Sequence, residues 1–354
     1  MEGNWSESTT LSTITNAQAE ADDVWSHAAY TTLGLVIALI GIIGMTTNAM
    51  VIILFVKNKE LRTPSNVHLL SMTISDLAIS VFGNPFSASS SLAMRWLFGL
   101  TLCHWYGFAN TCFGLVSLVT HAMIAVDRYC VICHDIKSTI KRATLMSCLA
   151  WLYCIIWSIF PIFGWSSYSP EGPGTWCSVT WERNINNTNS FVVCLFVFTV
   201  LIPVGILLFC YARIFNTYRK TIYNVVFESS ENTTRSLMKQ EWRLVRMTAL
   251  LVSGYLLAWM PYSVMSLMVV LGQHVSFTGA ALPSIFAKTS TCYNPVIYVF
   301  LHDKMRKSLV QMLPHGCASR FGGTPPNSSQ ATPGTSHRRT RHKSAGSIAG
   351  TTRT

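Results

Sequence analysis

Apolar residues gather into long runs along this chain, and short polar segments separate the runs. Each run is long enough to cross about 30 Å of hydrocarbon as a helix that rises 1.5 Å per residue. Because a helix in lipid satisfies its own backbone hydrogen bonds, the pattern predicts an all-α membrane protein, a seven-transmembrane helix bundle. The predicted spans are residues 29–56, 67–92, 104–130, 145–164, 191–215, 245–271 and 281–301.

The segments on either side of this 29–301 bundle have other patterns. Residues 1–28 are polar and acidic, without the basic and apolar regions of a cleavable signal peptide. Residues 302–317 carry apolar and basic side chains at helical spacing, which predicts a short amphipathic cytosolic helix on the membrane surface. Cys317 at its end is a predicted palmitoylation site, with an unmodified thiol as the alternative. Residues 318–354 are rich in Ser, Thr, Gly, Pro and Arg, which predicts a disordered cytosolic tail.

Charge gives the bundle a direction. Half of the 354 residues are hydrophobic and only 12% are charged, about half the charge of a soluble chain. Among the 26 Lys and Arg residues, only Arg95 and Arg183 fall in segments on the N-terminal side of the membrane. The positive-inside rule therefore places the N-terminus outside and the tail in the cytosol of a multi-pass plasma-membrane protein. The net charge of +11 is thus a topology signal, and no nucleic-acid partner is predicted.

The predicted outer side carries two kinds of modification signal. Asn4 and Asn186 stand in glycosylation sequons that would lie outside the membrane. Of the eleven cysteines, only Cys103 and Cys177 lie at the outer surface, where a disulfide persists. We therefore expect these two to pair and to hold the loop after the fourth span over the bundle. No metal site is predicted.

Lys288 is the only charged residue in the predicted seventh span. A charge at mid-membrane costs several kcal/mol, about 2.5–3.5 on insertion scales. One interpretation is a lysine near a helix end that extends to the interface. However, Lys288 lies roughly 10 Å deep, counted from Ala281 at 1.5 Å per residue. A desolvated lysine amine is a nucleophile that forms Schiff bases with carbonyl compounds, so a covalently bound aldehyde is the second interpretation.

A charged nitrogen in such a place needs a counterion, and the chain has only fifteen acidic residues. Most of them lie in the N-terminal segment, on the cytosolic side or inside spans, so Glu171 and Glu182 remain in the loop that Cys177 would tether. Glu171 lies six residues before Cys177, where the disulfide would hold it near the bundle mouth. We predict Glu171 as the counterion. A solvated loop glutamate is the alternative.

The inner end of the third span carries the sequence DRY, formed by Asp127, Arg128 and Tyr129. Arg128 lies 25 residues after Cys103, the full length of a tilted span. Glu241 begins the sixth span and is a predicted partner of Arg128, in a pair that would hold two helix ends together and release them on activation. The alternatives are an arginine that only anchors the span and an exposed acid at a helix start.

The seventh span ends in NPVIY, which contributes Asn294, Pro295 and Tyr298. Proline removes a backbone hydrogen bond, so a bend is predicted here. Asn48 and Asp76 are polar residues inside the first and second spans and are predicted to join Asn294 in a hydrated sodium or water network.

These features together resemble the rhodopsin-type G-protein-coupled receptors over residues from about 30 to 315. In that family, a lysine six residues before the NPxxY asparagine resembles the retinal attachment site of opsins. The chain is most similar to the non-visual peropsin and neuropsin branch, with some likeness to encephalopsins. The motifs that carry the resemblance are Asn48, Asp76, Cys103, DRY, Trp151, Pro203 with Tyr211, WMPY (259–262) and NPVIY.

The resemblance implies a photoreceptor in which Lys288 holds 11-cis or all-trans retinal as a Schiff base and Glu171 is the counterion of a bistable pigment. Tyr106 occupies the position of the counterion of vertebrate visual pigments. The other positions that match the retinal pocket are Gly114, Trp259 and Tyr262.

The implied partners are a heterotrimeric G protein, with the inhibitory Gi/o class favoured, a receptor kinase, arrestin and membrane lipid. The implied function is that of a receptor and not of an enzyme. The enzymatic alternative is a retinal photoisomerase of peropsin type. A light-driven ion pump would need a chain of intramembrane carboxylates, and only Asp76 lies deep in a span.

Overall fold

The computed structural model describes residues 25–181, 187–227, 232–273, 275 and 277–312, and for residues 222–227, 232–241, 277, 278 and 280 it describes only the backbone. The predicted sites Asn4, Asn186 and Cys317, the side chain of Glu241 and the predicted tail at 318–354 therefore lie outside this description.

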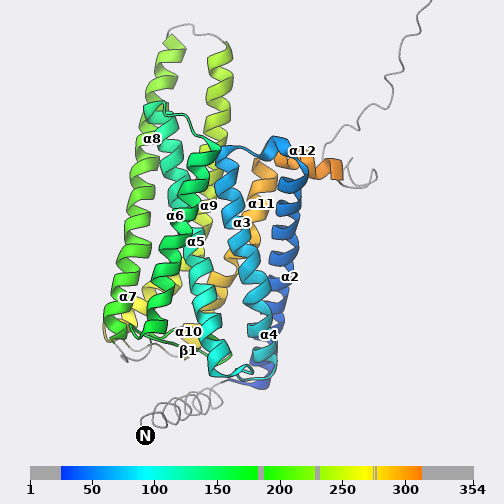
Figure 1. The fold of residues 1–354 in the computed structure, drawn as a ribbon, viewed down its shortest axis with the longest axis vertical. Coiled ribbons are helices and arrows are strands. Elements are labelled where there is room, and N and C mark those ends of the chain that lie inside the picture. The colour runs from blue at the N-terminus through cyan, green and yellow to red at the C-terminus, as the bar shows by residue number, and fades with distance from the viewer. Residues whose placement is uncertain (1–24, 182–186, 228–231, 274, 276, 313–354) are drawn as a thin grey trace, which may run out of the picture. The chain divides into compact units, whose positions relative to one another are not determined.

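Every predicted span is helical, and helix α5 (Gly99–His134) lies at the centre of the bundle (Figure 1). Around it pack α3 (Pro64–Phe82), α6 (Ile140–Ile159), α8 (Ile202–Phe227) and α9 (Asn232–Val270). The first span is α2 (His27–Lys57), which packs on α3 and on α4 (Asn84–Leu92). The smaller elements are η1 (Lys59–Leu61), η2 (Phe160–Phe163), α7 (Thr188–Phe196), the π-helical turn η3 (Val197–Leu201), α10 (Phe277–Lys288), α11 (Ser290–Leu301) and α12 (Asp303–Met312).

Six of the spans are long and apolar enough to be recognised as membrane-crossing helices by length and composition among the described residues. The seventh is divided into α10 and α11. Large apolar side chains on the outside of the spans, such as Leu35, Leu208 and Leu257, are more than half exposed, as lipid-facing positions require.

The seventh span breaks at Thr289, six residues before Pro295, which the sequence did not predict, and the bend at NPVIY stays a prediction. Helix α11 continues through Pro295. Proline at 295 frees the carbonyl oxygen of Thr291, four residues earlier. Asn48 in α2 donates to that oxygen, with Nδ2 at 2.9 Å. The polar neighbour therefore replaces the lost backbone bond, and the helix does not need to break there.

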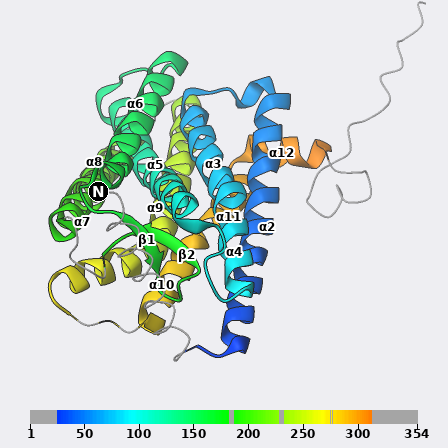
Figure 2. The same ribbon diagram turned by 60° about the horizontal axis from the view of Figure 1, so that its bottom comes forward.

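A two-stranded antiparallel hairpin lies across one end of the bundle, next to α5 and α10 (Figure 2). It consists of β1 (Tyr168–Glu171) and β2 (Trp176–Val179), and the sequence did not predict it. Cys177 in β2 forms the expected disulfide with Cys103 in α5, with a Cα–Cα distance of 5.5 Å. The disulfide therefore fixes the hairpin to the central helix α5 at Cys177.

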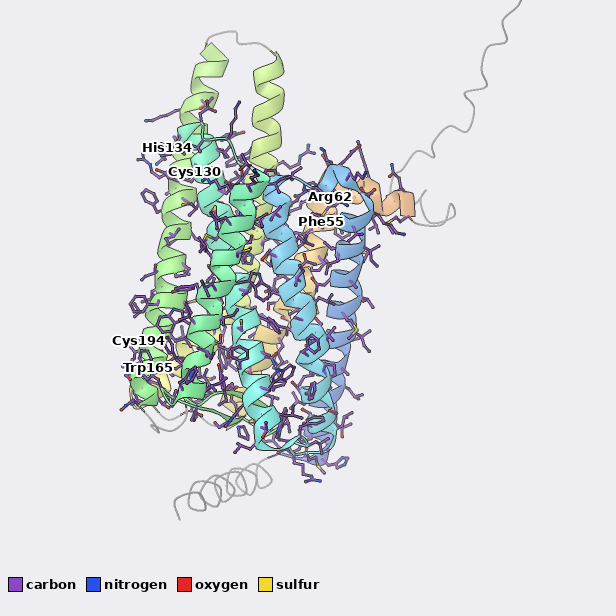
Figure 3. All side chains as sticks on the ribbon, in the orientation of Figure 1. Phe55, Arg62, Cys130, His134, Trp165 and Cys194 are labelled. Carbon is purple, nitrogen blue, oxygen red and sulfur yellow. A yellow bond between two sulfur atoms is a disulfide. The ribbon has the colours of Figure 1, made fainter. Side chains whose placement is uncertain are left out.

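The two ends of the bundle carry different side chains. Figure 3 places Trp165 and Cys194 at the hairpin end, and Arg62, Cys130 and His134 at the opposite end. At that opposite end α12 follows α11 directly, and its Met305 is buried in a cluster with Val51, Leu54 and Tyr298. The amphipathic helix after the seventh span is thus present, and it packs on the bundle through one apolar face.

Candidate functional site

A cavity of about 170 Å³ lies inside the bundle beneath the hairpin. Apolar and aromatic side chains form most of its wall, and a few polar groups converge at the hairpin side, an arrangement typical of small-molecule sites. The predicted pocket residues Tyr106, Gly114, Glu171, Trp259, Tyr262 and Lys288 all line it.

Lys288 is the last residue of α10 and lies at the break in the seventh span. Its Nζ donates a hydrogen bond to the hydroxyl of Tyr106 in α5, at 3.2 Å. The same nitrogen lies 5.8 Å from the centre of the Tyr106 ring and 5.4 Å from the centre of the Trp176 ring. Tyr106 is itself buried and hydrogen-bonded to Ser87 of α4. The amine therefore faces the cavity and aromatic groups, which argues against a lysine that extends to the membrane surface.

Glu171 ends β1 and is buried, with 4% of its surface exposed, so the solvated-loop alternative is wrong. Two indole groups donate to its carboxylate: Nε1 of Trp181 at 3.1 Å and Nε1 of Trp176 at 3.3 Å. Burial raises the pKa of Glu171 above its ordinary value, while hydrogen bonds from neighbouring side chains and the positive charge of Lys288 act in the opposite direction. The structure therefore brings the predicted amine and the predicted counterion to one cavity.

The floor of the cavity is formed by Trp259 of α9, which packs over Gly114 of α5. A Cβ atom added at Gly114 would lie 3.1 Å from the Trp259 ring, so glycine lets this ring approach the α5 backbone. The indole Nε1 of Trp259 donates to Ser290 at the start of α11, at 3.0 Å. Tyr255, one turn before Trp259, donates to the carbonyl oxygen of Gly114 at 2.8 Å. The floor thus joins three helices, α5, α9 and α11.

Gly107 provides a test of how tightly the hairpin packs on α5. A Cβ added there would lie only 2.4 Å from Cδ1 of Tyr168, and that ring is held because its hydroxyl donates to the carbonyl oxygen of Ser158 at 2.7 Å. We expect Gly107→Ala to lower the free energy of unfolding by about 1–3 kcal/mol through overpacking. Gly205→Ala is the control, since nothing lies within 4 Å of its added Cβ, and it should be neutral or slightly stabilising. Thermal unfolding in detergent measures both, and equal midpoints for the two variants would contradict the packing described here.

The DRY residues lie at the end of the bundle away from the hairpin. Arg128 donates to Asp127 at 2.5 Å, and Asp127 also accepts from Ser138 of the following loop at 2.7 Å. Tyr129 is hydrogen-bonded to His134 at 2.9 Å. The predicted pair between Arg128 and Glu241 stays a prediction, because the Glu241 side chain lies outside the described part of the chain.

Two further contacts connect helices in this half of the bundle. Asn294 donates to Asp76 at 2.8 Å, and Asn48 reaches the same region through the carbonyl oxygen of Thr291. Tyr211 of α8 donates to Thr248 of α9 at 2.8 Å. The structure thus brings Asn294 together with Asp76 but not into direct contact with Asn48.

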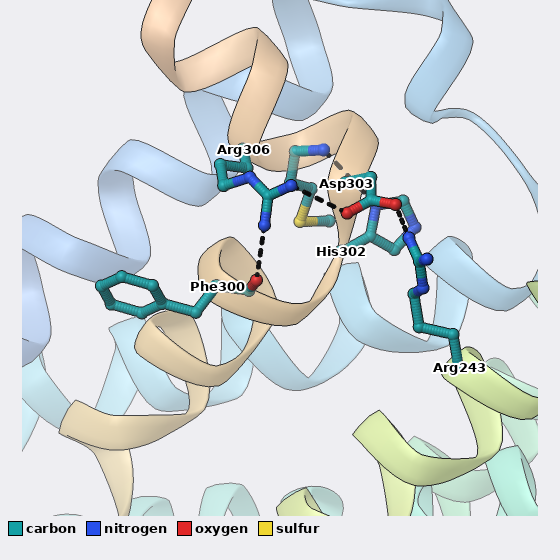
Figure 4. Close-up of polar contacts among 6 residues, drawn as sticks. Arg243, Phe300, His302, Asp303 and Arg306 are labelled. Carbon is teal, nitrogen blue, oxygen red and sulfur yellow. Dashed lines mark hydrogen bonds and ion pairs between the residues drawn. The ribbon is translucent and has the colours of Figure 1, made fainter. Parts of the chain in front are cut away.

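Sequence reasoning missed three features of the structure: the indole pair Trp176 and Trp181, the serine Ser87, and the acidic residue Asp303. The roles of Trp176 and Trp181 depend on the hairpin, and Ser87 is one of several serines in a polar run. Asp303 of α12 was also missed: it forms ion pairs with Arg306 of its own helix, at 3.0 Å, and with Arg243 of α9 (Figure 4). The adjacency of Trp176 to the disulfide Cys177 was the one available signal.

Comparisons with known proteins agree with this fold. The sequence model of the "7 transmembrane receptor (rhodopsin family)" matches residues 47–298. Melanopsin of Felis catus is 36% identical over 304 residues, which cover 82% of this chain and 62% of that protein. Rhodopsin of Todarodes pacificus is 35% identical over 300 residues, which cover 81% of this chain and 67% of that protein.

A crystal structure of squid rhodopsin matches with a TM-score of 0.78 and 32% sequence identity, covering 86% of this chain and 94% of that chain. The chain spans about three fifths of the length of the melanopsins that it matches. It belongs to the rhodopsin family of seven-transmembrane receptors, in the opsin branch.

Proposed function

We propose that this protein is a non-visual photoreceptor that holds retinal covalently at Lys288 and activates a heterotrimeric G protein in response to light. The observation that carries the proposal is one lysine amine among the described residues that line the cavity, with the buried carboxylate of Glu171 in the same lining. A family of receptors, together with relatives named melanopsin and rhodopsin, supports a receptor rather than an enzyme.

The chemistry of the cavity fits retinal. An aldehyde needs a nucleophilic amine, which Lys288 supplies, and a long apolar polyene needs a wall of apolar and aromatic side chains. Gly114 leaves space that any side chain would fill against Trp259. Retinal supplies the absorption of light and a change of shape on isomerisation. Glu171 balances the charge at the Lys288 nitrogen, and Tyr106 orients that nitrogen by a hydrogen bond.

The residues of α9 connect the cavity to the other end of the bundle. Trp259 contacts the cavity, and the same helix carries Thr248 and Arg243, which bond to α8 and α12. A light-driven change can favour a second state only by contacts that differ between the two states. In this proposal the start of α9 moves away from Arg128 and α12 and opens a surface for a G protein of the Gi/o class, and later for a receptor kinase and arrestin. The N-terminus lies outside the plasma membrane and this surface lies in the cytosol.

The test is nucleotide exchange on purified G proteins by the retinal-loaded protein, in darkness and after illumination. We expect exchange to rise on illumination, with the Gi/o class the most responsive. Conversion of all-trans to 11-cis retinal with release of the product, and no exchange on any G-protein class, would instead identify a photoisomerase. The absence of any light-dependent absorption change would refute both functions.

Asp303→Asn tests the restraint on α9. The ion pair between Arg243 and Asp303 is about half exposed, so its loss should cost about 1 kcal/mol or less. If this pair holds α9 in the inactive position, basal exchange in darkness should rise up to about five-fold, the factor that 1 kcal/mol gives. Arg306→Gln is the control, because Arg306 bonds Asp303 and Phe300 without reaching α9. Equal basal exchange in Asp303→Asn and wild type would show that the pair does not restrain α9.

A further inference from the structure

The side chain of Trp176 is in contact with both the Lys288 amine and the Glu171 carboxylate. The Lys288 nitrogen lies 5.4 Å from the centre of its ring, and its Nε1 donates to the Glu171 carboxylate at 3.3 Å. No direct ion pair within 4 Å joins Lys288 to Glu171 in the described part of the chain. The indole therefore lies in contact with the cation through its face and with the anion through its edge.

The hairpin holds Trp176 in this place. Glu171 and Trp176 are paired residues in the strand register, so their side chains leave the hairpin as cross-strand neighbours. The next residue, Cys177, is bound to Cys103 of the central helix. Trp176 is only 1% exposed and packs with Tyr106 and Ala281 in a buried cluster. An indole fixed on three sides has few other orientations.

Both contacts of Trp176 stabilise charged groups, a protonated nitrogen at Lys288 and an ionised carboxylate at Glu171. A cation against the face of a desolvated tryptophan is attracted by the negative face of the ring. A hydrogen bond to a charged acceptor is stronger than one to a neutral acceptor. Because the carboxylate is buried, it depends on neighbouring donors, which are the two indole N–H groups together with the hydroxyls of Ser178 and Tyr262. Of the two indoles, only Trp176 also lies close to the Lys288 amine, through the face of its ring.

We propose that Trp176 is a positioning residue that couples the Lys288 nitrogen to the Glu171 carboxylate, its ring face held against the first and its N–H bonded to the second. The proposal rests on the proposed photoreceptor function, and it adds that the counterion acts largely through Trp176. Trp181 bonds the other carboxylate oxygen and has no such position relative to Lys288. Among the described residues, the other titratable side chains that face the pair are Tyr106 of α5 and Tyr262 of α9.

The test is a mutant cycle between Glu171→Gln and two matched indole variants, Trp176→Phe and Trp181→Phe. Each Phe variant keeps an aromatic ring and removes one N–H bond to Glu171. In retinal-loaded protein, the readout is the pH at which half of the visible band is lost. The reference is the shift in this pH that Glu171→Gln causes in otherwise wild-type protein. We expect that shift to fall to less than half of the reference when Trp176→Phe is also present. It should stay above half of the reference when Trp181→Phe is also present. Equal shifts in the two backgrounds, or a larger shift with Trp176→Phe, would overturn the coupling. If Trp176→Phe does not fold, Trp176→Tyr takes its place.

A second readout uses retinal-free protein. Lys288 is methylated with formaldehyde and cyanoborohydride over a range of pH, and the modified peptide is quantified by mass spectrometry. The same cycle should show the same asymmetry in the pH dependence of labelling. A wild type that forms no pigment but shows this asymmetry would refute the photoreceptor function and keep the coupling. A wild type that forms pigment but lacks the asymmetry would refute the coupling and keep the photoreceptor function.

Discussion

Replacing Lys288 with alanine is expected to abolish pigment formation with added retinal completely. The amine is the only nucleophilic nitrogen among the described residues that line the cavity, so no neighbour can take its place. Its hydroxyl partner Tyr106 and the carboxylate of Glu171 remain, but neither forms a stable adduct with an aldehyde under these conditions. The measurement is the absorption spectrum of purified protein after incubation with 11-cis or all-trans retinal.

Two controls separate loss of the amine from loss of the fold. Lys288→Arg keeps the positive charge against Tyr106 and Trp176 but has no amine that forms a Schiff base, so it should fold and form no pigment. Lys307→Ala removes an exposed lysine of α12 and should give the wild-type spectrum. Borohydride reduction of the wild type should leave the retinyl group on the peptide that contains Lys288. A visible band of unchanged height in Lys288→Ala would remove the attachment site.

The helices of this bundle are predictable because hydropathy alone determines them. A long run of apolar residues in lipid satisfies its backbone hydrogen bonds as a helix, so the spans and the position of Lys288 inside the seventh follow from the sequence. The break at Thr289 does not follow. The sequence shows Pro295, but whether proline breaks a helix depends on what bonds the carbonyl oxygen that it frees. Here that partner is Asn48, which lies 243 residues away in the chain.

The contacts of Glu171 likewise could not be predicted from the sequence alone. Its distance from Cys177 in the sequence suggests a position near the mouth of the bundle, and this is where it lies. Its partners depend on the strand register, which pairs Glu171 with Trp176 and brings Trp181 alongside. A shift of one residue would turn these side chains to the other face of the hairpin. The sequence has no turn signal strong enough to fix that register before the disulfide is known.

Glu171→Gln is expected to lower the pH at which half of the visible pigment is lost by about 1–3 units, the usual effect of a nearby opposite charge. At neutral pH this should move absorption toward the near ultraviolet, because an uncompensated positive charge at the Lys288 nitrogen is disfavoured in a cavity of low dielectric constant. Glu171→Asp keeps the charge and should give a smaller shift. Glu60→Gln, at an exposed position of η1, should give none. An unchanged titration in Glu171→Gln would assign the counterion role to another group.

The same substitution has a consequence for the stability of the retinal-free protein. Burial raises the pKa of Glu171 in the folded state above the value of 4.5 that it has when exposed. Between these two values the folded state binds more protons than the unfolded state, so stability falls as the pH rises through this window. In Glu171→Gln the contribution is absent, and the fall in unfolding temperature above pH 4.5 should become shallower. A slope that is the same in wild type and in Glu171→Gln would mean that burial does not raise the pKa of Glu171 in the folded state.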